Sequence, residues 1–277
     1  MTPPLQTPAP LLRATGLQKT YSQASLWSGK SRSFRALDGI NLELARGSCT
    51  ALIGSSGSGK STLAMCLARL DEPDSGEIWF DGMDLSRLGE KKLRAVRPRI
   101  QVIFQDASGS LNPGFTAAEL VEEPLLVQEI GSPSERKHRA SEVLESLGIP
   151  RGRHACRPHE FSGGQRRRIG LARALVLKPS LMILDEVFSG LDLTTSSQIL
   201  QHLLNLRAQQ DLTLLFISHD LTLLAAAVDS VFVMQAGRIV EQGSPGNLAA
   251  DPQHPHTRAL FSAHEELSRT MAKGAAR

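Results

Sequence analysis

The sequence predicts an α/β fold in which parallel strands carry helices on their faces. Apolar runs at 181–184 and 212–217 are typical of buried strands, and stretches with helical periodicity lie between such runs. Strands that alternate with helices form parallel sheets, because a crossover helix is the usual connection between parallel neighbours. Residues from about 116 to 158 combine helical periodicity, many charges and Pro or Gly breaks. We interpret this stretch as a helical subdomain inserted into the α/β core.

Strand signals also lie outside this alternating core. Residues 11–21 predict an edge strand, and 77–84 predict a hairpin that turns at Asp81-Gly82. We therefore expect an antiparallel β subdomain near the N-terminus. Two short runs around Ala236-Gly237 predict a closing antiparallel hairpin. The expected boundaries are a loose tail at 1–10, a main domain at 11–250 with its helical insertion at about 106–160, and a C-terminal extension at 251–277.

The composition is that of an ordinary soluble globular protein. The chain has 277 residues, of which 41% are hydrophobic and 21% charged, and its formal net charge is +3. The first ten residues lack the basic and apolar regions of a signal peptide, and no run approaches the length of a membrane span. Three scattered cysteines do not suggest a disulfide framework. These features argue against secreted, integral-membrane and fibrous proteins and favour a reducing compartment.

A glycine-rich loop provides the strongest chemical signal. The segment 54–61 reads Gly-Ser-Ser-Gly-Ser-Gly-Lys-Ser and fits G-x-x-x-x-G-K-[ST] without a mismatch, between an expected strand and an expected helix. Glycines allow successive backbone N–H groups to face phosphate oxygens, and the helix N-terminus adds positive potential. The residues expected to hold a nucleotide are Gly54, Ser55, Ser56, Gly57, Ser58, Gly59, Lys60, Ser61 and Thr62. The alternative is a chance Gly/Ser turn.

An acidic pair follows the apolar run 181–184. Asp185 at the end of a parallel strand beside a phosphate loop would order Mg²⁺ through water, while Glu186 would polarise the attacking water. Taken alone, the pair could be a solvated turn after a strand. The phosphate loop upstream favours the catalytic interpretation.

Further motifs narrow this interpretation to one family. Phe161-Ser162-Gly163-Gly164-Gln165 resembles the signature sequence of ATP-binding cassette (ABC) ATPases, which usually begins with Leu. The other family motifs follow in order over residues 11–260. They are the adenine-stacking aromatic at Tyr21, the Q-loop at Gln105, the D-loop at Ser189-Gly190-Leu191-Asp192 and the switch histidine at His219.

The resemblance implies the chemistry of these residues. It implies that Ser61 and Gln105 hold Mg²⁺, with Asp185 acting through water, and that Glu186 and His219 align the attacking water. It also implies that Ser162, Gly163, Gly164 and Gln165 close over the ATP of a partner cassette. The run Arg166-Arg167-Arg168 invites a nucleic-acid interpretation, but its helix continues into apolar residues, so we expect no nucleic acid there.

Two strings resemble the branch that imports oligopeptides, dipeptides and nickel. They are Ser110-Leu111-Asn112-Pro113 and the string from His254 to Leu260, His-Pro-His-Thr-Arg-Ala-Leu. The resemblance implies an ATPase subunit at the cytoplasmic face of a bacterial inner membrane. Its partners would be a second, non-identical ATPase (or a second copy), two permeases and an extracytoplasmic substrate-binding protein. Peptide, nickel and metallophore substrates remain open, as does a non-transport ABC ATPase in DNA repair or translation. An unrelated phosphate-loop kinase would leave the signature motif and His219 unexplained.

Overall fold

A computed structural model describes residues 9–24, 31–104, 109–219 and 221–262 of the chain. These residues divide into two compact units, one formed by 1–93 with 213–277 and the other by 94–212. The boundary at 93/94 falls within helix α2 (Glu90–Val96). Each unit is described below by itself.

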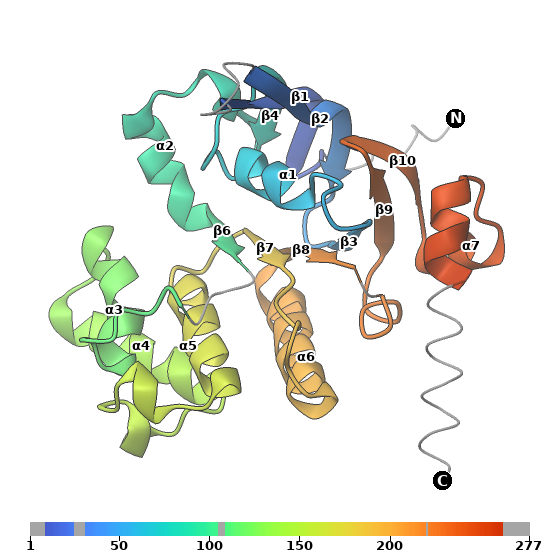
Figure 1. The fold of residues 1–277 in the computed structure, drawn as a ribbon. Helices are drawn as coiled ribbons and strands as arrows, with labels where there is room; N and C mark the ends of the chain where they lie inside the picture. Colours follow the sequence, from blue (N-terminus) through green and yellow to red (C-terminus); the bar gives the residue numbers. More distant parts are fainter. Residues whose placement is uncertain (1–8, 25–30, 105–108, 220, 263–277) are drawn as a thin grey trace, which may run out of the picture. The chain divides into compact units, whose positions relative to one another are not determined.

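The first unit contains a four-stranded antiparallel sheet in the order β2-β1-β4-β5 (Figure 1). Side chains alternate between the two faces of a strand, and alternate positions in parts of the sheet are apolar and buried, such as Leu12 and Ala14 on one strand and Ile78 and Phe80 on another. The predicted turn at Asp81-Gly82 is present, and both residues have positive φ. The strands are β1 (Leu12–Ala24), β2 (Ser31–Leu44), β4 (Ser75–Phe80) and β5 (Met83–Asp84).

A second set of strands in this unit carries the phosphate loop. Strand β3 (Cys49–Ile53) is fully buried and pairs in parallel with β8 (Thr213–Ser218) and β9 (Ser230–Gln235). Strand β10 (Arg238–Gly243) closes the predicted hairpin against β9. Six residues separate β3 from helix α1 (Lys60–Leu67), which lies next to β2 (Figure 1). Helix α7 (Pro245–Ala250) and a helical segment at 255–262 complete the described part of the unit.

The second unit pairs two parallel strands with a group of helices. Strand β6 (Ile100–Ile103) runs parallel to β7 (Leu181–Asp185), and all five residues of β7 are buried. Helices α3 (Ala117–Val127), α4 (Pro133–Ser146) and α5 (Gly163–Leu175) pack against one another (Figure 1). Helix α6 (Leu193–Gln210) follows the turn after β7. The helices at 117–146 lie where the sequence predicts a helical insertion; its expected boundaries stay predictions.

One strand prediction is wrong in its position. The segment 11–21 was expected at a sheet edge, but β1 lies between β2 and β4 and pairs with both. Its partners come from residues 31–44 and 75–80, and sequence periodicity does not indicate such distant pairings.

The three cysteines are free thiols in different environments. Cys49 and Cys66 are completely buried, whereas Cys156 is partly exposed. Burial raises the pKa of the Cys66 thiol to about 11.

Helix α4 depends on a capping box at its N-terminus. The Ser132 hydroxyl accepts a hydrogen bond from the Glu135 N–H (3.4 Å), and the Glu135 carboxylate accepts one from the Ser132 N–H (2.7 Å). We expect Ser132→Ala to lower the free energy of unfolding by about 1 kcal/mol, measured by urea denaturation. The control is Lys137→Ala, an exposed position of the same helix, which should be neutral or slightly stabilising because alanine favours a helix interior. Equal effects of the two changes would contradict the capping role.

Candidate functional site

The glycine-rich loop is packed against backbone atoms of the same unit. A side chain at Gly54 would place its Cβ 2.2 Å from the Met234 carbonyl oxygen, and one at Gly59 would lie 2.3 Å from the Ala36 carbonyl oxygen. Gly59 also has φ +106°, in the left-handed region that L side chains rarely adopt. Glycine is therefore required at both positions, for lack of space at Gly54 and for lack of space and backbone conformation at Gly59.

The β9–β10 turn supports the loop from outside. The N–H of Gly237 donates a hydrogen bond to the Ser58 carbonyl (2.9 Å), and the carbonyl of Gly237 accepts one from the Asp38 N–H (2.9 Å). The Asp38 carboxylate also pairs with Arg238 (2.6 Å), and the bonds from Arg238 and then Arg35 hold the pKa of Asp38 below its usual value. The loop conformation is thus fixed by segments more than 170 residues apart in the chain.

Lys60 is the buried cation of this loop, with only 7% of its surface exposed. Its ammonium group donates hydrogen bonds to the carbonyl oxygens of Gly54 and Ser55, both at 2.9 Å, and approaches the Ser58 hydroxyl at 3.4 Å. The loop therefore curls around its own lysine, and the same positive charge is available to an anion seated on the loop. Helix α1 starts at Lys60, so its first N–H groups and the positive end of its dipole are at the same place.

Tyr21, the candidate adenine-stacking residue, lies in the same unit as the loop. It is 38% exposed, and its hydroxyl donates a 2.6 Å hydrogen bond to the Asp71 carboxylate. Burial and this bond raise the pKa of Tyr21, although the Thr62 hydroxyl opposes them. The aromatic side chain is therefore close to the first turn of α1 and is held at its polar end.

The acidic pair of the second unit occupies two different environments. Asp185 is the last residue of β7 and is 5% exposed, whereas Glu186 is partly exposed and leaves the strand with φ +49°. This left-handed conformation turns the chain sharply, and the Glu186 carbonyl accepts a hydrogen bond from the Ser189 N–H (3.0 Å). The two neighbouring carboxylates are thereby directed by different backbone conformations.

The signature and D-loop segments lie side by side in this unit. Ser162 caps helix α5, and its hydroxyl accepts from the Gln165 N–H (3.3 Å) while Gln165 reaches back to the Ser162 N–H (3.1 Å). A Cβ at Gly164 would lie 3.5 Å from the Thr195 methyl group of helix α6. Asp192 caps α6, and its bonds to the N–H and hydroxyl of Thr195 lower its pKa.

The arginine run beside the signature packs within its unit. Arg166 donates to the Phe161 carbonyl (3.0 Å), Arg167 to the Ser189 carbonyl (2.6 Å) and Arg168 to the Gln198 side chain (2.9 Å). The Arg167 bond ties the signature helix to the D-loop. These contacts give each guanidinium a structural partner, in line with the packed helix expected from the sequence.

The two remaining candidate site residues are His219 and Gln105. His219 directly follows β8 and is exposed, and Gln105 lies outside the described residues. The first unit brings together Tyr21, the loop 54–62 and His219, and the second holds Asp185, Glu186, the signature 162–165 and Asp192. Their functional roles stay predictions at this point.

Comparison with protein families decides the assignment. Residues 37–189, which span the loop, the signature and the acidic pair, match the family model described as ABC transporter. The chain belongs to the ABC transporter family. It is an ABC ATPase cassette that binds ATP, and it is the ATP-hydrolysing component of a transporter.

Curated relatives of this ABC ATPase cover most of its length. The dipeptide transport ATP-binding protein DppF of Escherichia coli is 38% identical over 94% of this chain and 78% of its own. The oligopeptide transport ATP-binding protein AppF of Bacillus subtilis is 40% identical over 87% of this chain and 73% of its own.

Solved structures agree with the ABC fold. A dimeric ATP-binding cassette, MJ0796, in a post-hydrolysis state bound to ADP and Pi has a TM-score of 0.76. It is 29% identical and covers 84% of this chain and 98% of its own. The predicted fold class, a phosphate-loop NTPase core with antiparallel and helical subdomains, is confirmed.

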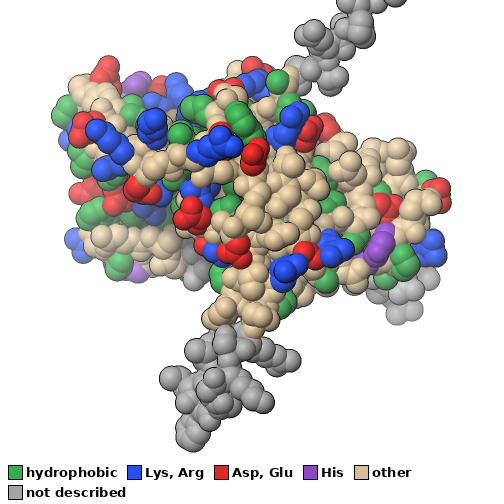
Figure 2. All heavy atoms as spheres, turned by 90° about the horizontal axis from the view of Figure 1, so that it is seen from above, with side chains coloured by type: hydrophobic (Ala, Val, Ile, Leu, Met, Phe, Trp, Pro, Cys, Tyr) green, Lys and Arg blue, Asp and Glu red, His purple; other side chains and the backbone are tan. Residues whose placement is uncertain are grey.

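The surface of the ABC cassette has mixed charge. On the face seen in Figure 2, Lys and Arg side chains are interspersed with Asp and Glu. Among the described residues no helix is both long and apolar enough to span a membrane. The described part of the chain also contains no cluster of three or more His, Cys, Asp or Glu with the geometry to hold a metal.

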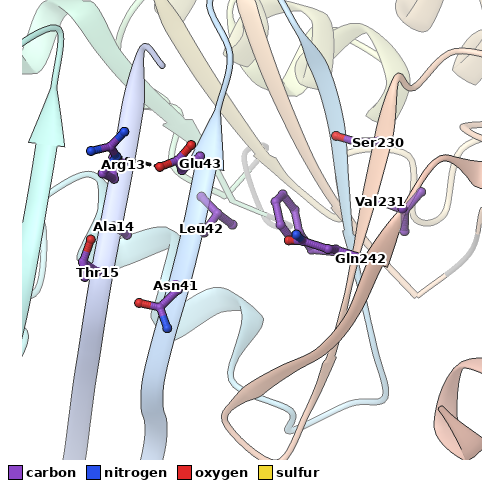
Figure 3. A pocket seen from close by; sticks show the side chains of 11 residues that line it. Arg13, Ala14, Thr15, Asn41, Leu42, Glu43, Ser230, Val231 and Gln242 are labelled. Atoms are coloured by element: carbon purple, nitrogen blue, oxygen red, sulfur yellow. Dashed lines mark ion pairs between the residues drawn. The ribbon is translucent and has the colours of Figure 1, made fainter. Parts of the chain in front are cut away.

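A pocket of about 590 Å³ in the first unit has none of the motif residues in its lining. It is lined by strands β1, β2, β9 and β10, and an ion pair between Arg13 and Glu43 (2.6 Å) crosses its wall (Figure 3). Other polar side chains there already have partners: Asn41 accepts from the Gly16 N–H (2.9 Å), and Ser230 bonds to Thr50 (3.2 Å). The pocket therefore offers few unsatisfied groups to a ligand.

Some residues that support the site lie in other segments of the chain and could not be identified from the sequence. Met234 and Ala36 contribute backbone oxygens against the loop, and Asp71 holds Tyr21. Backbone packing leaves no residue-specific signal in a sequence. Asp71 could have been noticed only as part of the acidic string that follows helix α1.

The close approach of Met234 to Gly54 generates a testable prediction. We expect Gly54→Ala to weaken ATP binding at least about tenfold, because the loop or β9 must move to admit the methyl group. Binding of a fluorescent ATP analogue measures the effect. Gly89→Ala is the matched control, since a Cβ at Gly89 meets nothing within 4 Å. Unchanged binding by Gly54→Ala would contradict the packing constraint.

Proposed function

We propose that the chain is the ATP-hydrolysing subunit of a bacterial importer that takes up peptides. The observation that carries this proposal is the complete phosphate loop around buried Lys60, in a chain similar to DppF and AppF over most of its length. The names of these relatives favour dipeptides and oligopeptides over nickel or a metallophore as the substrate class. They also favour transport over a role in DNA repair or translation.

The first unit supplies the phosphate-binding groups. In our proposal the backbone N–H groups of 54–62 and the Lys60 ammonium hold the nucleotide phosphates, and Tyr21 stacks on the adenine. Ser61 and Gln105 would hold Mg²⁺, with buried Asp185 acting through water. This oxygen donor set suits Mg²⁺, which usually takes one or two protein carboxylates or hydroxyls and completes its shell with water and phosphate. When bound, the ion neutralises charge on the transferred phosphoryl group.

Hydrolysis would depend on Glu186 and His219. The partly exposed Glu186 carboxylate would accept a proton from the attacking water, while His219 would contact the γ-phosphate. The different backbone conformations of Asp185 and Glu186 support a division of roles, because the buried carboxylate serves the metal and the exposed one serves water.

A second cassette would complete the ATP site. In our proposal Ser162, Gly163, Gly164 and Gln165 contact the nucleotide held by the partner, and Asp192 lies at the same face. Support comes from the adjacency of signature and D-loop, from the 72% exposure of Leu193, and from the positive end of helix α5. The partner cassette would be a second, non-identical ATPase or a copy of this chain.

Two permeases and an extracytoplasmic substrate-binding protein would complete the importer, with this chain at the cytoplasmic face of the inner membrane. A pocket of about 320 Å³ in the second unit is our candidate for contact with a permease. It is lined in part by Phe104, which is 40% exposed, and by Arg173, which is anchored to Glu123 (2.8 Å). Phe104 immediately precedes Gln105, so a permease segment seated there would adjoin the Q-loop.

The proposed domain boundaries remain 11–250 for the main domain and 251–277 for the C-terminal extension, with the helical insertion at about 106–160.

If Glu186 is the general base, a substitution there should slow ATP hydrolysis without weakening ATP binding. Glu186→Gln should keep ATP binding and slow hydrolysis by about 10²–10⁴-fold, because the amide cannot accept the proton. Lys60→Ala should instead lose ATP binding. Equilibrium binding and phosphate release measure the two effects, with exposed Glu142→Gln as the control. Wild-type turnover in Glu186→Gln would exclude Glu186 as the base.

The importer role is tested by purifying the chain from detergent-solubilised membranes of its native host. We expect two permeases and a second ATPase to co-purify, and Phe104→Ser to reduce their recovery. Uptake of labelled dipeptide into cells should require the wild-type chain and fail with Lys60→Ala. Recovery with ribosomes or DNA and without membrane proteins would leave the ATPase chemistry intact but contradict transport.

A further inference from the structure

Asp71 joins two side chains of strand β1 to the loop that follows helix α1. One carboxylate oxygen accepts a hydrogen bond from the Lys19 ammonium and the other accepts one from the Tyr21 hydroxyl, both at 2.6 Å. Burial would raise the pKa of Asp71, but the bonds from Lys19 and Tyr21 outweigh it and lower that pKa. The carboxylate is therefore ionised at neutral pH and has both oxygens engaged.

The same loop also holds the backbone of β1. The Thr20 N–H donates to the Asp74 carboxylate (2.7 Å), and the Asp74 N–H donates to the Gln18 carbonyl (2.8 Å). Lys19 makes a further bond to the Glu72 carbonyl (2.7 Å). Consecutive residues of β1, from Gln18 to Tyr21, are thus fixed by Asp71, Glu72 and Asp74 of the loop.

These contacts leave one part of Tyr21 available. Its hydroxyl is bound to Asp71, and the Lys19 ammonium lies over the ring, 5.3 Å from the centroid. Tyr21 nevertheless remains 38% exposed. A ring with its polar tip held and a cation over one face is restricted in orientation and offers the other face to a planar partner.

Residues of helix α1 and of the loop after it also set the position of this ring relative to the phosphate loop. The Thr62 hydroxyl, in the first turn of α1, lowers the pKa of Tyr21, opposing burial and the Asp71 bond, which raise it. At the other end of the helix, the chain turns back so that the Asp71 N–H reaches the Met65 carbonyl (3.3 Å). The loop that follows the helix beginning at Lys60 therefore carries the group that orients Tyr21.

We propose that Asp71 is a positioning residue for nucleobase binding: it fixes Tyr21 so that the adenine ring of ATP stacks on the face opposite Lys19. This inference rests on the proposed binding of ATP phosphates at 54–62. Asp71 itself does not touch the nucleotide. Because every base has a π-face, such a platform strengthens binding of nucleotides in general and discriminates little between ATP and GTP.

The test compares ATP with inorganic triphosphate, which has no base, by calorimetric titration in the presence of Mg²⁺. We expect Asp71→Ala to weaken ATP and GTP binding by about five- to tenfold and to leave triphosphate binding unchanged. Asp71→Asn, which keeps an acceptor for the Tyr21 hydroxyl, should recover most of the loss. The matched control is Glu72→Ala in the same loop, because the Glu72 side chain is 78% exposed.

A double mutant separates positioning from a general structural effect. In a Tyr21→Ala background, Asp71→Ala should cause no further loss of ATP affinity, since the ring that it orients is absent. Equal weakening of ATP and triphosphate by Asp71→Ala would overturn the proposal, and so would unchanged ATP binding or an additive double mutant. A wild-type chain that binds neither ATP nor triphosphate would instead contradict the phosphate site.

Discussion

The contact between the glycine-rich loop and the backbone of β9 is the constraint on which the first unit depends. The loop must bring its N–H groups together around Lys60, and it does so only because Gly54 and Gly59 allow carbonyl groups of distant segments to approach them. A side chain at either position would collide with backbone, which cannot rotate away as a side chain can. The sheet therefore fixes the shape of the loop before any ligand binds.

The residues proposed to act on ATP lie at the ends of buried strands or directly after them. Asp185 is the last residue of buried strand β7, His219 directly follows β8, and Lys60 opens the helix that follows β3. Such edges are where open α/β sheets bind ligands, because loops there are positioned by rigid strands but keep their own side chains accessible. Conserving the strand cores and varying the loops would change the chemistry without changing the fold.

Local patterns made the phosphate loop, the acidic pair and the β9–β10 hairpin predictable. Each is contained in one short stretch of the chain, where hydrophobic period and turn chemistry are decisive. The interior position of β1 and the Asp71–Tyr21 bond were not predictable, because each joins segments far apart in the chain. The motifs of the candidate site were thus found from sequence, whereas the groups that hold them in place required coordinates.

The environments of the cysteines have a practical consequence for spectroscopy. Cys49 and Cys66 are inaccessible, and the high pKa of Cys66 further suppresses its thiolate, which is the reactive form. Cys156 is partly exposed and lies in the second unit, which also carries the signature helix. A maleimide fluorophore added to the unmodified chain would therefore label the second unit selectively, and its signal would follow that unit during the ATPase cycle without any engineered cysteine.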